Sequence, residues 1–74
     1  MEHYVYVKVN GETAARVWTN HSMTIEEALY CAGYDITDKE DCKAGYEKGV
    51  PGFYIDDNGE YQFDIENAEM TFEK

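Results

Sequence analysis

Basic residues, proline and cysteine are all scarce in this chain of 74 residues, and long apolar runs are missing. Six Lys and Arg stand against sixteen Asp and Glu, and the net charge of −10 argues against direct binding of nucleic acid or of an anionic membrane. No stretch approaches the ~20 apolar residues of a membrane-spanning helix. The opening residues lack the basic and apolar regions of a signal peptide, so we expect a cytoplasmic protein of the host cell.

The two cysteines, Cys31 and Cys42, are too few for a disulfide framework. A reducing compartment favours free thiols that pack as small core residues, although the sequence does not fix their redox state. Cys31 and His21 could be imagined as a thiol–imidazole pair, but nothing in the sequence brings them together.

Motifs for catalysis and for metal binding are also missing. The sequence has no zinc-ligand spacing, no nucleophile elbow and no glycine-rich phosphate loop. Aligning Gly59 with the invariant glycine of an EF-hand puts Tyr54 and Ile65 at positions that require carboxylates. We therefore expect a protein that is not an enzyme and that has no cofactor and no metal.

Two alternating segments, residues 3–9 and 13–19, predict an opening β-hairpin. Asn10-Gly11 favours a two-residue turn, but that register would place Arg16 on the apolar face. A three-residue turn keeps the valines together and leaves Arg16 outside. We prefer the three-residue turn because the pattern of apolar side chains decides the register.

Helix signals follow the hairpin. Thr24 and Glu27 form a capping box, which predicts a helix from about Ile25 to Ala32 that ends at Gly33. Its predicted buried stripe consists of Ile25, Ala28, Leu29 and Ala32. The stretch Thr37-Asp38-Lys39-Glu40 repeats the capping pattern and suggests a second helix, weakened by Gly45, over residues 38–46.

The last third of the chain predicts a three-stranded meander. A hairpin over residues 53–65 turns at Gly59, and a tight turn at Glu66-Asn67 would return a third strand beside the second. The expected fold is one domain, residues 1–74, of class α+β and order ββα(α)βββ, with one main helix packed on one face of a small antiparallel sheet. Whether this sheet is a single layer is left open.

This meander would gather negative charge on its outer face. The face is predicted to carry Asp56, Glu60, Asp64, Glu69 and Glu73, with Tyr54 and Gln62 between them. On sheet geometry the five carboxylates would crowd a patch about 15 Å across. The plain alternative is a solvated face on which charge protects edge strands from aggregation.

The predicted function follows from that face. A carboxylate array could imitate the phosphates of a nucleic acid and occupy the basic groove of a partner such as a nuclease or CRISPR effector. Small acidic anti-restriction and anti-CRISPR inhibitors of phages and mobile elements act as DNA mimics of this kind, which is an analogy of class only.

A second prediction uses the opening hairpin, where Tyr4, Tyr6, Lys8, Arg16 and Trp18 share a face. Aromatic side chains with Arg are typical of protein interfaces, so this face could bind a partner protein or form a homodimer, with charge serving solubility only. The same aromatic side chains could instead form a second small core beneath residues 34–52.

Overall fold

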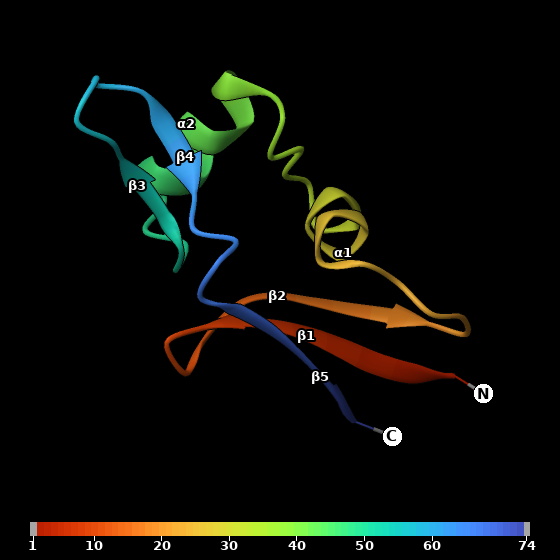
Figure 1. Cartoon of the computed structure of the whole chain (residues 1–74). Helices are drawn as coiled ribbons and strands as arrows, with labels where there is room; N and C mark the ends of the chain where they lie inside the picture. Colours follow the sequence, from red (N-terminus) through yellow and green to blue (C-terminus); the bar gives the residue numbers. More distant parts are fainter. Residues whose placement is uncertain (1, 74) are drawn as a thin grey trace.

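The computed structural model describes residues 2–73 and confirms the α+β class (Figure 1). The elements are β1 (His3–Val9), β2 (Glu12–Thr19), α1 (Ile25–Cys31), α2 (Lys39–Glu47), β3 (Phe53–Ile55), β4 (Tyr61–Phe63) and β5 (Ala68–Glu73). The strands form two separate antiparallel sheets, one of order β2-β1-β5 and one of β3 with β4. The molecule is elongated, with principal extents of 42 × 21 × 19 Å.

The β1–β2 hairpin combines both turns that the sequence suggested. Val9 pairs with Glu12 across Asn10 and Gly11, whose φ angles of 52° and 83° suit a two-residue turn with two left-handed positions. An irregularity beside Ala14 then shifts the register, so that Val7 pairs with Ala15. The preferred three-residue turn is therefore wrong, but the predicted pairing of β1 with residues 15–18 is confirmed.

The predicted meander is wrong in its third strand. β5 pairs with β1, where Ala68, Met70 and Phe72 lie opposite Val9, Val7 and Val5. A two-stranded hairpin is marginal in water, and β1 offers a seven-residue edge while β4 offers only three residues. Residues 64–67 form a bend in which Asn67 donates to Asp64, and this bend redirects the chain from one sheet to the other.

Helix α1 covers one face of the three-stranded sheet. Thr24 and Glu27 make the predicted capping box, and Gly33 ends the helix with a φ of 103°. Ala28 and Leu29 are fully buried against the β1 valines, whereas Ala32 is exposed, so the predicted buried stripe is shorter than expected.

Helix α2 supports the small β3–β4 sheet, and Asp38, rather than Thr37, is its N-cap. Gly45 lies against the ring of Phe53, which stacks edge-on with Phe63 at a centroid distance of 5.0 Å. The predicted β3–β4 register, with Phe53 opposite Phe63 and a left-handed Gly59 in the turn, is confirmed. The glycine that weakens the helix thus allows the sheet to approach it.

Candidate interaction surface

The face of the three-stranded sheet opposite α1 carries aromatic and charged side chains in a regular grid. Alternation along the strands sends Val5, Val7 and Val9 inward, so their neighbours point outward. We call the resulting surface the outer sheet face. It consists of Tyr4, Tyr6 and Lys8 on β1, Thr13, Arg16 and Trp18 on β2, and Glu69, Thr71 and Glu73 on β5.

The rings of this face contact one another and hold its cations. Tyr4 meets Trp18 edge-on at a centroid distance of 4.6 Å, and the Arg16 guanidinium carbon lies 4.6 Å from the Tyr4 centroid. Lys8 Nζ lies 5.9 Å from the Tyr6 centroid, and the Tyr6 hydroxyl donates to Glu73 at 3.4 Å. Each of these contacts fixes side chains that would otherwise be free in solvent.

The outer sheet face is open. Figure 1 shows α1, α2 and the β3–β4 sheet all on the same side of the β2-β1-β5 sheet. Trp18 is 51% exposed, and Arg16 is exposed as well. Residues 34–52 pack instead with β3 and β4, so the expectation that they cover these aromatic side chains is wrong.

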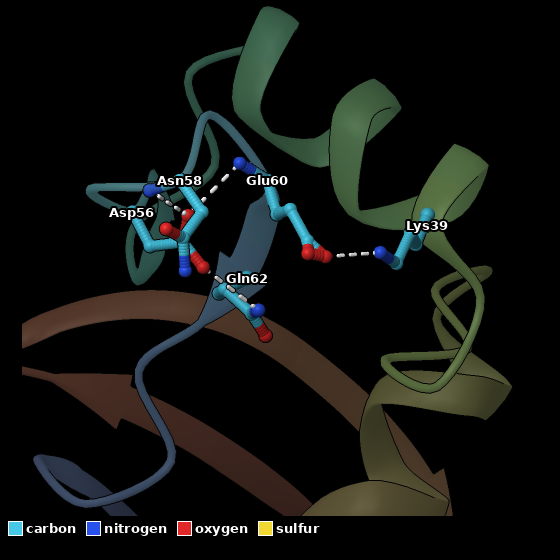
Figure 2. Close-up of polar contacts among 5 residues, drawn as sticks. All are labelled: Lys39, Asp56, Asn58, Glu60 and Gln62. Carbon is cyan, nitrogen blue, oxygen red and sulfur yellow. Dashed lines mark hydrogen bonds and ion pairs between the residues drawn. The ribbon is translucent and has the colours of Figure 1, made fainter.

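Asp56 stabilises the β3–β4 turn, and Glu60 ties this hairpin to α2 (Figure 2). Asp56 accepts hydrogen bonds at 2.9 Å from the backbone N–H groups of Asn58 and Glu60, and at 3.0 Å from the Gln62 amide. These bonds, above all the one from Glu60, hold the pKa of Asp56 below its ordinary value. Glu60 forms an ion pair with Lys39 of α2.

The predicted five-carboxylate face does not exist as one surface. Asp56, Glu60 and Asp64 surround the β3–β4 hairpin, whereas Glu69 and Glu73 lie on the outer sheet face because β5 pairs with β1. Tyr54 and Gln62 are register partners on β3 and β4, as expected. The predicted role of these seven residues in binding a basic partner stays a prediction.

Several other carboxylates also have local structural tasks. Glu27 and Asp38 cap the two helices, Asp41 accepts from the backbone N–H of Asp35, and Asp35 accepts from Thr37. Hydrogen bonds from Thr24 and Thr37 lower the pKa values of Glu27 and Asp35. Within residues 2–73, the carboxylates without a hydrogen bond or ion pair are Glu2, Glu12, Glu26, Glu40, Glu47, Asp57, Glu66 and Glu69.

A hollow of about 480 Å³ lies beside α1. Its lining includes Met23, Tyr30 and Ile36 together with His21 and Cys31, so the structure brings the imagined thiol–imidazole pair to one hollow. Cys31 is exposed, and no hydrogen bond joins it to His21, whose Nδ1 donates to the Ser22 carbonyl oxygen. Residues 2–73 contain no group of three or more His, Cys, Asp or Glu side chains arranged to hold a metal ion.

Sequence reasoning found the β1 and β2 side chains of the outer sheet face but missed the contribution of β5. The signal for this strand was the run of Val5, Val7 and Val9, since three β-branched residues on one face suit a strand with neighbours on both sides. No helix of the described residues is long and apolar enough to cross a membrane. No protein-family model, no curated protein and no solved structure matches this chain.

Proposed function

We propose that this protein is a non-enzymatic interaction protein that binds another protein through the outer sheet face. The observation that carries the proposal is that Tyr4, Tyr6, Arg16 and Trp18 form one contiguous uncovered surface. Trp, Tyr and Arg dominate the binding energy of protein interfaces. A domain this small would ordinarily bury such large aromatic side chains in its core.

The test is a binding experiment with a matched control. The tagged protein is incubated with host lysate, and bound proteins are identified before and after a wash in high salt. We expect Trp18→Ala to abolish capture of a partner that wild type retains, because truncating a central aromatic anchor costs about 2 kcal/mol or more.

Tyr30→Ala is the control for this experiment. Tyr30 is 68% exposed on α1, away from the outer sheet face, so its loss removes an exposed aromatic side chain of similar size. A partner lost equally from both variants, or from neither, would contradict the proposal.

The second candidate function is the acidic inhibitor that occupies a basic nucleic-acid-binding groove. The net charge of −10 favours it, because so large a charge attracts a basic surface over a long range and exceeds the roughly 2–8 units that solubility needs. The carboxylates available for it are those without structural tasks, such as Asp57, Glu66 and Glu69.

Inhibition of a candidate nuclease or CRISPR effector, measured across a salt series, tests this second function. The informative variant changes Asp57, Glu66 and Glu69 to Asn or Gln, because these substitutions leave the caps and turn bonds in place. We expect inhibition to weaken with added salt and with neutralisation. Inhibition that is unchanged by both would exclude charge mimicry.

A further inference from the structure

The outer sheet face has opposite charges on its two edge columns. The β2 column carries Arg16, and the β5 column carries Glu69 and Glu73, which flank Thr71 on the same face. Tyr4 and Tyr6 lie between the two columns on β1. The face is therefore positive along one edge, aromatic in the centre and negative along the other edge.

Among residues 2–73, no ion pair joins any of these charges to a side chain of opposite sign. In residues 2–73 the single ion pair joins Lys39 and Glu60. Arg16 lies over the ring of Tyr4 instead. Lys8 lies over the ring of Tyr6, although Glu69 is its register partner. Arg16, which is exposed and held on an aromatic ring, is therefore available to carboxylates of another molecule.

We infer that the partner of the outer sheet face is a second copy of this chain, stacked face to face about a two-fold axis parallel to β1. This inference rests on the proposed function. That axis lays β2 of each copy over β5 of the other. Arg16 then lies over Thr71 of the second copy, between Glu69 and Glu73, and this contact occurs twice. Tyr4 and Tyr6 meet their counterparts at the axis.

The charge pattern selects this axis over the alternative. A two-fold axis perpendicular to the strands would lay Arg16 on Arg16 and Glu69 on Glu73, so that like charges meet throughout. Along the chosen axis Trp18 lies over Glu73 of the second copy, and the one like-charge contact is Lys8 with its counterpart. Each Lys8 retains Glu69 of its own copy as a register partner, and the negative charge of that carboxylate offsets the repulsion between the two ammonium groups.

The interface is small. Three side chains from each of three strands, nine in all, face the second copy, against the roughly 20–30 residues a side of a standard interface. We therefore expect a reversible dimer with a dissociation constant on the order of micromolar. The aromatic centre supplies the affinity, and the edge charges fix the orientation.

Sedimentation equilibrium over a concentration series tests the dimer by charge exchange. We expect wild type to shift toward twice the chain mass of 8.5 kDa as concentration rises. Arg16→Glu alone, and Glu69→Lys with Glu73→Lys, should each remain monomeric. An equimolar mixture of the two variants should form a heterodimer, because both edge contacts then join opposite charges. Circular dichroism of each variant verifies its fold.

The outcomes separate this inference from the proposed function. A wild type that stays monomeric, or charge variants that do not associate when mixed, overturns the homodimer. If such a monomer still captures a different protein through Trp18, the proposed function stands. A dimer that is indifferent to Trp18→Ala and to the charge exchange uses another surface and overturns this inference, whereas the proposed function is overturned by the capture experiment with Trp18→Ala and Tyr30→Ala. If the inference is right, Trp18→Ala should raise the dissociation constant of the dimer at least about tenfold.

Discussion

Asp56 organises the β3–β4 turn through hydrogen bonds to its ionised carboxylate. Because the folded-state pKa lies below the ordinary value of 3.8, this contribution is full above that value and is lost as the pH falls through and below it. Asp56→Asn keeps one oxygen acceptor but removes the charge. We expect the unfolding free energy of wild type to decline more steeply than that of Asp56→Asn between about pH 5 and pH 2.

Denaturant titrations of both proteins at several pH values measure the two slopes. The carboxylates of Glu27 and Asp35, whose pKa values are also lowered, contribute equally to both proteins. The difference between the slopes therefore isolates Asp56. Parallel curves would show that the charge on Asp56 does not stabilise the turn.

The two thiols differ sharply in their surroundings. Cys42 is 2% exposed, and its Sγ donates to the Ile36 carbonyl oxygen at 3.4 Å. Burial, and then the negative charges of Asp41, Asp35 and Asp38, raise the pKa of this thiol, so it stays protonated and unreactive. Cys31 is exposed. We expect a thiol reagent to label one cysteine in the native protein and two in denaturant, with Cys31→Ser abolishing the native reaction.

At the level of elements, α2 depends on a glycine where helix propensity alone would prefer alanine. A Cβ on Gly45 would lie 2.6 Å from two ring carbons of Phe53, closer than real contacts allow. Gly→Ala in a helix normally gains about 1 kcal/mol. Overpacking costs about 1–3 kcal/mol, so we expect Gly45→Ala to destabilise the protein in denaturant unfolding.

A double variant tests the cause of that loss. Because Phe53→Leu removes the ring that the new methyl group would strike, Gly45→Ala combined with Phe53→Leu should lose less stability than the sum of the single losses. Additive losses would mean that the contact with Phe53 is not responsible.

The bulge in β2 makes one residue dispensable. Without Ala14, the two-residue turn at Asn10-Gly11 continues as a regular ladder with Val7 still opposite Ala15 and Arg16 still outside. We therefore expect deletion of Ala14 to preserve the fold at a cost of about 1 kcal/mol, from the lost packing of a half-buried methyl group.

Deletion of Arg16 is the control for this prediction. It would turn Val17 to the outer sheet face and reverse every later side chain of β2, so we expect it to unfold the protein. The melting temperatures of the two deletion variants, measured by thermal unfolding, test this prediction. If deleting Ala14 were as damaging as deleting Arg16, the bulge would be essential to the hairpin.

For the whole molecule, like-charge repulsion opposes the compact state at a net charge of −10. Salt screens this repulsion, with a Debye length of about 10 Å at 0.1 M. The one ion pair of the described residues is exposed and contributes at most about 1 kcal/mol, so screening it loses little. We expect the melting temperature to rise as NaCl is added from low ionic strength. A fall in the melting temperature would contradict the claim that like-charge repulsion outweighs the ion pair.

The local parts of this fold were predictable from the sequence, while the pairing of the last strand was not. The capping box at Thr24 and the left-handed Gly59 depend on neighbouring residues, and both are confirmed. The alternation of β5 identifies Met70 and Phe72 as one face, but it does not say which strand lies beside them. That choice depends on the unpaired edge of β1, far away in the chain.

The difficulty of predicting distant strand pairings also explains which residues of the outer sheet face could be identified from the sequence. Tyr4, Tyr6 and Trp18 were correctly assigned to one face because a hairpin is local. Glu69 and Glu73 were assigned to the wrong sheet, and the five-carboxylate surface failed with them. The hairpin pairings follow from nearby sequence, yet the distant pairing of β5 with β1 decides which charges become neighbours.

The central position of β1 also bears on synthesis by the ribosome. β1 is made early, but its second neighbour, β5, is the last element of the chain, with Tyr4 opposite Glu73. Until β5 emerges from the exit tunnel, the nascent chain presents a valine-rich strand with one row of unpaired backbone groups, a template for intermolecular association. Rapid synthesis of the segment from β2 to β5 would therefore protect newly made molecules, and slow translation of that segment would leave them vulnerable.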